Sequence, residues 1–89
     1  MKELPPGVTA YKRTESFTED TVPKGLLADH RTAEGVWGLI QVEEGRLDYI
    51  IGDDDAVVLT QGRNGVVEPQ VTHRVRPVGK VRFFDEFYR

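Results

Sequence analysis

Hydrophobic and polar residues alternate with a period of two along much of the chain. The clearest alternation is in residues 46–51, where Leu47, Tyr49 and Ile51 share one face and Arg46 and Asp48 share the other. Similar runs that favour strands cover residues 8–13, 36–42, 56–60, 66–68, 72–76 and 80–88. No segment keeps a period of 3.6, so the pattern predicts seven or eight short strands and no substantial helix.

Residues that favour turns separate these runs. Turns are expected at Glu43–Gly45, 52–55, 61–65 and Val78–Gly79, while 15–23 reads as a loop that Pro23 keeps from becoming a helix. The three aspartates at 53–55 are expected to form a solvated hairpin tip, because a calcium loop would need further ligands at fixed spacing. Many short strands with turns between them favour an all-β sandwich or barrel, and the length of 89 residues favours one domain over 1–89.

Composition narrows the expected partners and location. The net charge is −3 and the 12 basic residues are scattered, so we expect no nucleic-acid partner. The absence of cysteine excludes disulfides and thiolate metal sites, and it fits a reducing cytoplasm. The first residues contain no apolar signal region, and no apolar run approaches the roughly 20 residues of a membrane span. We therefore expect a cytoplasmic domain with no membrane partner.

The two histidines are the first candidates for a chemical site. His30 and His73 each lie at the edge of a strand-like run. Imidazole is a common ligand of first-row metals, but two imidazoles need at least one further ligand to hold a metal well. Either histidine can equally be a structural residue, His73 in the core and His30 at the surface. Candidates for a third ligand are the carboxylates Glu34, Glu68, Asp85 and Glu86.

The period of the last strand leaves the choice of carboxylate open. Asp85 shares a face with Val81, Phe83 and Phe87. The opposite face carries Glu86 between two other aromatic residues, Phe84 and Tyr88. Both faces are almost equally apolar, so the alternation alone does not choose between Asp85 and Glu86.

Three segments carry a more specific pattern. The sequence resembles the small cupin-like domain of the TehB/YeaR group over nearly its whole length. The matching segments are His30-x-Thr32-x-x-Gly35-x-Trp37-Gly38 with Val42-x-x-Gly45-x-Leu47, then Val67-x-Pro69-x-x-x-His73-x-Val75, and finally Phe84-x-Glu86-Phe87-Tyr88.

This resemblance implies a cupin-like double-stranded β-helix, a jelly-roll barrel with a cavity between its sheets. It implies a divalent metal, with zinc as first candidate and iron or nickel as alternatives, held by His30, His73 and Glu86. The sequence departs from the broader cupin pattern, because the position of the motif glutamate falls at Gly38. Some members of the group are associated with tellurite resistance, and in TehB proteins the domain precedes a methyltransferase.

Three functions are compatible with the sequence. The first is a metal-binding cupin-like domain, homodimeric and cytoplasmic, that binds a small molecule or anion in tellurite-type stress. The second is a metal-dependent enzyme, because two histidines and one carboxylate form the iron site of non-heme oxygenases. The third is a metal-free homodimeric binding module that uses Trp37, Phe84 or Tyr88 as its interface. The sequence leaves open whether there is any turnover.

Overall fold

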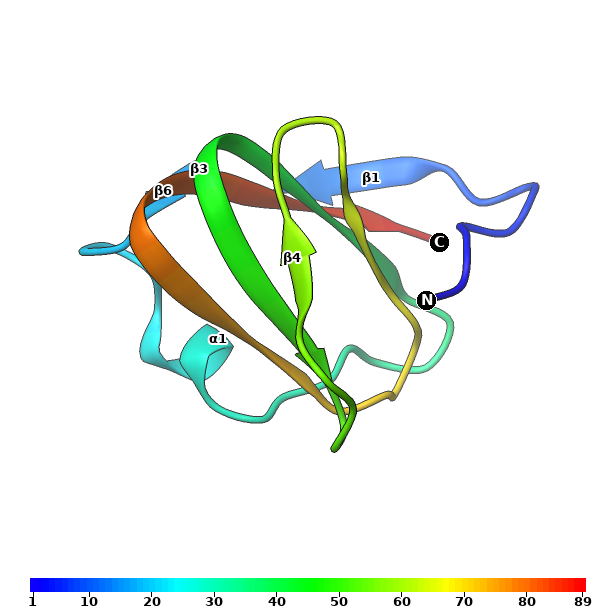
Figure 1. Ribbon diagram of the computed structural model, residues 1–89. Coiled ribbons are helices and arrows are strands. Elements are labelled where there is room, and N and C mark those ends of the chain that lie inside the picture. Colours follow the sequence, from blue (N-terminus) through cyan, green and yellow to red (C-terminus); the bar gives the residue numbers. More distant parts are fainter.

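Two long antiparallel strands form the centre of the fold, β3 (Trp37–Ile51) and β6 (His73–Tyr88). The computed structural model describes all residues from 1 to 89. The two strands pair from Trp37 opposite Tyr88 to Ile51 opposite His73. Both bend back on themselves at the left of Figure 1, so that the two halves of the sheet face each other across the core.

Four short strands extend this central pair on both sides. On one side of it, β4 (Val57–Leu59) and β5 (Gly65–Val67) pair with opposite halves of β3. On the other side, β1 (Ala10–Arg13) and β2 (Phe17–Thr18) pair with β6. The result is one six-stranded sheet in which every pairing is antiparallel. The all-β prediction is confirmed, but the strand pairing forms an open sheet rather than the closed jelly-roll barrel that we expected.

Two turns predicted from the sequence are irregularities inside long strands. Glu43–Gly45 was expected to end a strand, yet β3 continues through it with register shifts on both sides. Val78–Gly79 was expected to separate two strands, yet both residues lie within β6. Pro77 is tolerated nearby because a proline at an irregularity need not donate to the ladder. The predicted number of strands was therefore too high, since two pairs of predicted strands merge.

The segment between β1 and β3 contains structure that the sequence pattern did not predict. It forms the two-residue strand β2 and the single-turn helix α1 (Lys24–Leu27). Pro23 directly precedes α1, where the N–H that proline lacks would have no helical partner. With only four residues, α1 cannot cross a membrane, and no helix in the structure could do so.

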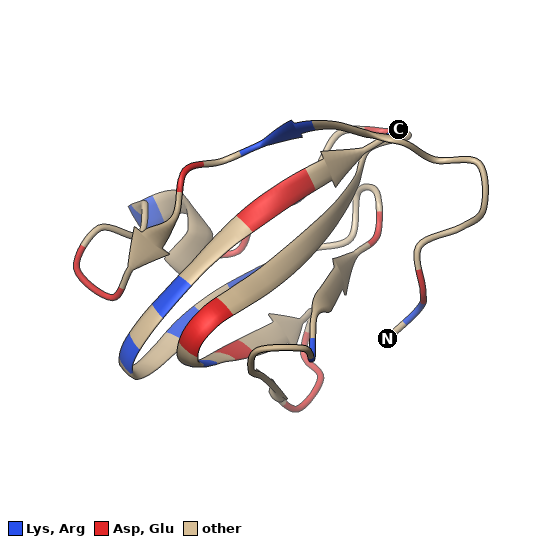
Figure 2. Cartoon of the chain, turned by 90° about the horizontal axis from the view of Figure 1, so that it is seen from above, with Lys and Arg blue, Asp and Glu red and all other residues tan.

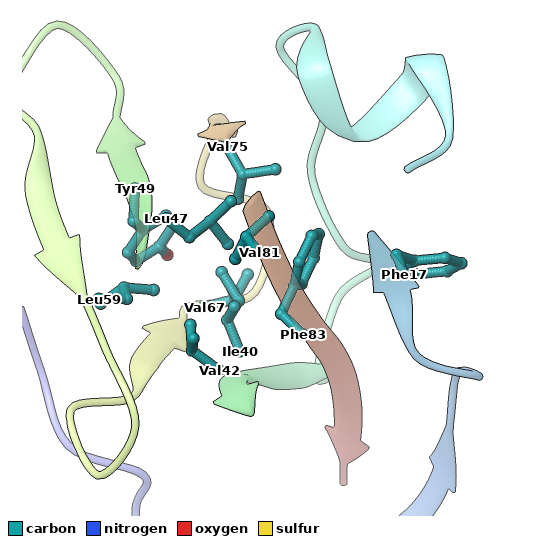
Figure 3. Packing of buried hydrophobic residues seen from close by; sticks show 10 residues of the cluster. All are labelled: Phe17, Ile40, Val42, Leu47, Tyr49, Leu59, Val67, Val75, Val81 and Phe83. Carbon is teal, nitrogen blue, oxygen red and sulfur yellow. The ribbon is translucent and has the colours of Figure 1, made fainter. Parts of the chain in front are cut away.

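The core lies between the facing halves of the bent sheet (Figure 3). Leu47, Leu59 and Phe83 are completely buried, and Phe17 packs edge-on against Phe83 with ring centroids 5.8 Å apart. Burying one such side chain stabilises the fold by about 1.5–3 kcal/mol. The core cluster consists of Phe17, Ile40, Val42, Leu47, Tyr49, Leu59, Val67, Val75, Val81 and Phe83.

Tyr49 joins the core to β5 through its hydroxyl group. The ring is 1% exposed, and the hydroxyl donates a hydrogen bond of 2.8 Å to the carbonyl of Val66. We expect Tyr49→Phe to lower the free energy of unfolding by roughly 1 kcal/mol, because that carbonyl loses its donor. Thermal unfolding should show a drop in Tm of about 5 °C. Tyr11→Phe is the control, since Tyr11 is exposed, and an equal effect of both variants would contradict the role of the hydrogen bond.

Charged residues of both signs are mixed along the chain (Figure 2). Arg76 pairs with Asp48 at 2.7 Å, and Arg82 lies 3.8 Å from both Glu43 and Glu44. Exposed ion pairs of this kind contribute little to stability.

Candidate functional site

The two histidines, far apart in sequence, are in direct contact. Residue 30 forms an antiparallel bridge with the first residue of β6. The amide of His30 donates to the carbonyl of His73 at 3.0 Å, and the amide of His73 donates back to His30 at 2.9 Å. The ring centroids are 4.1 Å apart with an angle of 55° between the planes. The backbone therefore fixes both imidazoles in one place.

Each imidazole is held in the same tautomer by its own loop. The Nδ1 atom of His30 lies 3.1 Å from the carbonyl of Ala28, and that of His73 lies 3.0 Å from the carbonyl of Val71. A carbonyl can only accept, so each Nδ1 carries the hydrogen and donates. Neither Nε2 atom has a hydrogen-bond partner within the chain. In the neutral form of the rings, both Nε2 lone pairs are free to accept hydrogen bonds.

Residues of the family-like motifs build the loops around the pair. The hydroxyl of Thr32 donates to the carbonyl of Val36 at 2.7 Å, and the carbonyl of Thr32 accepts from the amide of Gln70 at 3.1 Å. Gly35 closes the turn between them with a φ of +76°, a conformation that favours glycine. These contacts tie the loop of His30 to the loop that leads to His73.

The histidine pair lines a pocket of about 320 Å³, which we call the histidine pocket. Its lining residues come from β1, α1, residues 30–36, β3, β5 and β6. Its apolar walls include Leu26, Ala33, Val36, Leu39, Val67 and Phe87. Its polar lining residues are Tyr11, Lys12, His30, Arg31, Thr32, His73 and Asp85.

The carboxylate in this pocket is Asp85, whereas the resemblance implied Glu86. Successive residues of a strand point to opposite faces. Asp85 follows the inward-facing Phe83 by two residues, and it pairs in register with Ile40 of the core. Glu86 lies on the other face, where it accepts hydrogen bonds from Gln41 at 3.0 Å and Tyr88 at 2.6 Å. The assignment of Glu86 to the histidines therefore does not match the geometry.

The residues present do not form the implied metal site. No group of three or more His, Asp or Glu side chains lies close enough together to hold a metal ion. Glu34 is exposed in a loop, and Glu68 forms an ion pair of 3.2 Å with Lys2. Two imidazoles alone leave a metal ion short of protein ligands. A resident metal held by His30, His73 and a carboxylate does not fit this arrangement.

Burial shifts the ionisation of two groups in the pocket. The pKa of His73 is lowered mainly by its burial; the Val71 carbonyl opposes this, and the charge of His30 adds to the lowering. Burial also raises the pKa of Asp85 to about 6. At pH 7, His73 is therefore neutral and most Asp85 is ionised. Lys12 and Arg31 also line the pocket and supply positive charge.

Sequence reasoning named Asp85 as one of four candidate carboxylates for this site but did not identify Lys12 or Arg31 as parts of it. The alternation of β6 put Asp85 on one of two almost equally apolar faces, so it did not choose between Asp85 and Glu86. No signal in the sequence pointed to Lys12 or Arg31, because their positions depend on how β1 and the loop fold over the sheet. The pocket combines two free imidazole acceptors, one buried carboxylate and two cations, a set that suits a small polar ligand.

Comparisons with known proteins agree with this fold. The structure is similar to that of a protein from E. coli (strain K12), with a TM-score of 0.89, 19% sequence identity, and coverage of 100% of this chain and 97% of that one. It is also similar to the crystal structure of TehB from Haemophilus influenzae, with a TM-score of 0.83 and 27% identity over 91% of this chain. The chain spans only 31% of the length of that TehB chain.

A search of curated proteins found no match. The model of the TehB-like domain matches residues 12–84, which include both histidines and most of the two central strands. The chain therefore belongs to the TehB-like domain family.

Proposed function

We propose that this TehB-like domain binds a small oxyanion of the tellurite class in the histidine pocket, as part of a response to tellurite-type stress. The observation that carries the proposal is the contact between two imidazoles whose Nε2 atoms both lack a partner. Tellurite and selenite keep a hydroxyl group near neutral pH. Their hydroxyls can donate to the Nε2 lone pairs, while Lys12 and Arg31 attract the negative charge.

The composition of the chain favours binding over reaction. The sequence contains no cysteine, so no thiol is present to reduce a bound oxyanion. A hydrogen bond from the ligand hydroxyl to an imidazole Nε2 atom and long-range attraction by two cations hold a ligand without forming a covalent bond. We infer that the domain captures its ligand, and that any chemical change of the ligand takes place on another protein or domain.

We also propose that the domain is related to cupins and to the YeaR group. A bent antiparallel sheet with a ligand pocket on its inner side supports a relation to cupins and to the YeaR group. The homodimer and the cytoplasmic location stay predictions, and sedimentation or size-exclusion measurements on the purified chain would check the first of them.

The test is calorimetric titration of the purified protein with sodium tellurite and sodium selenite. We expect saturable binding with one ligand per chain. In the double variant His30→Asn/His73→Asn, the amide nitrogen of asparagine can keep the donor to the local carbonyl, but Nε2 is lost. We expect the affinity of this variant to fall about fivefold, since the single hydroxyl of the bound monoanion loses its Nε2 acceptor and with it one hydrogen bond of about 1 kcal/mol.

Lys12→Ala and Lys80→Ala form a matched pair of controls. Lys12 lines the histidine pocket, whereas Lys80 lies in the bulge of β6 outside it. We expect weaker oxyanion binding in the first variant and unchanged binding in the second. Unchanged binding in the double histidine variant would contradict the proposal. Titration of the same proteins with zinc chloride tests the metal-binding alternative, which would gain support if zinc bound and neither oxyanion did.

A further inference from the structure

The side chain of Asp85 is held at the edge of the histidine pocket without a partner. Its backbone is fixed on both sides, because its amide donates to the hydroxyl of Thr14 at 3.0 Å and its carbonyl accepts from the Thr14 amide at 2.8 Å. The carboxylate atom Oδ1 is buried and accepts no hydrogen bond. Buried polar atoms in folded proteins are nearly always hydrogen-bonded. The Asp85 carboxylate therefore stands beside the pocket with a buried oxygen that has no hydrogen-bond partner.

No cation of the chain neutralises this carboxylate. The ion pairs of the structure involve other acids, and neither Lys12 nor Arg31 forms one with Asp85 although all three line the pocket. The other polar side chains on the lining are the two histidines, Tyr11 and Thr32. His73 has a lowered pKa and is neutral at pH 7. Asp85 is thus the only acidic residue that lines this pocket.

We propose that the Asp85 carboxylate selects ligands by the protonation state of the ligand, an inference that rests on the proposed function. The pocket accepts an oxyanion that retains a hydroxyl group and rejects a dianion. A hydroxyl group can donate to a free Nε2 atom, whereas a fully deprotonated oxyanion has no hydrogen to donate. A dianion is also repelled by the carboxylate, and this repulsion is strong in a partly buried site because water screens it poorly. The effect does not require direct contact between Asp85 and the ligand.

Selenite and selenate are suitable probes because they contain the same central atom. At pH 7, selenite is largely a monoanion that keeps its hydroxyl, and selenate is a dianion without one. We expect wild-type protein to bind selenite at least about tenfold more tightly than selenate in competition titrations. Asp85→Asn removes the negative charge at nearly the same volume, and we expect it to reduce this preference at least about tenfold, mainly through tighter binding of selenate.

Glu86→Gln provides the matched control. It removes a carboxylate from the next residue of the same strand, but on the face outside the pocket. We expect it to leave the selenite preference unchanged. Circular dichroism of each variant checks that it is folded, and the preference measured on wild-type protein tests the inference even if Asp85→Asn does not fold.

The outcomes separate this inference from the proposed function. Equal affinity of the wild type for selenite and selenate would overturn the role of Asp85 and leave oxyanion binding intact. A preference that persists unchanged in folded Asp85→Asn would do the same. Absence of any oxyanion binding in the wild type would overturn the proposed function itself, and the inference with it.

Discussion

Replacing Gly45 with alanine should destabilise the domain by about 2–5 kcal/mol, from the cost of a left-handed backbone and of overpacking together. Gly45 lies in the irregular part of β3 with a φ of +75°. A Cβ atom at this position would lie 2.0 Å from the carbonyl oxygen of Lys80 and 3.1 Å from the Cα of Val81. Both neighbours are backbone atoms, so the strands themselves would have to move apart. Since small domains have only about 5–15 kcal/mol of stability, the variant should be close to unfolding at 37 °C.

Gly62→Ala separates the two causes of this effect. Gly62 also has a positive φ, +86°, but a Cβ atom there would meet nothing within 4 Å. We expect this variant to lose only about 1–2 kcal/mol, the cost of the left-handed backbone alone. Urea unfolding of both variants gives the comparison. If both variants lost the same free energy of unfolding, the close approach of β3 to the Lys80 backbone would not contribute to the effect at Gly45.

This close approach also explains why the sequence predicted too many strands. Two segments have the composition of turns. One is Glu43–Gly45, and the other is Val78–Gly79, which follows a proline. In the structure each segment lies at the place where a long strand bends, and Gly45 is needed there because the facing strand leaves no room for a side chain. Composition identifies where the backbone must depart from a regular strand. It does not say whether the strand ends or bends, since that depends on the pairing partner.

The site was predictable in part. The two histidines stand out because they are the only ones in the chain and each borders a strand. Their contact depends on a bridge between residue 30 and the start of β6, and no local pattern encodes that bridge. For the carboxylate, the period of β6 placed Asp85 on the same face as Phe83, and the structure puts both on the inner side. The resemblance pointed instead to Glu86, which forms hydrogen bonds on the outer face.

Asp85→Asn should stabilise the domain at neutral pH and lose this advantage in acid. Burial raises the pKa of Asp85 from 3.8 to about 6, so between these values the folded chain holds a proton that the unfolded chain has released. Folding stability from this group therefore falls as the pH rises from about 4 to 7. The full effect is about 3 kcal/mol, because each pKa unit corresponds to about 1.4 kcal/mol.

Wild type must be compared with Asp85→Asn at each pH, because His73 changes the stability of the domain with pH in the opposite direction to Asp85. Its lowered pKa means that the unfolded chain binds protons more readily in mild acid, so its contribution to stability falls as the pH drops through the ordinary value of 6.5. Both proteins contain His73, so the difference in unfolding free energy between wild type and Asp85→Asn isolates Asp85.

We expect that difference to shift by up to about 3 kcal/mol in favour of the variant between pH 4 and pH 7.5, as measured by urea unfolding at several pH values. Asp54→Asn, at the exposed tip of a hairpin, is the control and should show a difference that hardly depends on pH. A pH-independent difference for Asp85→Asn would mean that the carboxylate is solvated or paired in the folded protein. The pH dependence of stability tests the unpartnered Asp85 carboxylate in the ligand-free protein. The preference for selenite over selenate tests the same carboxylate in the presence of a ligand.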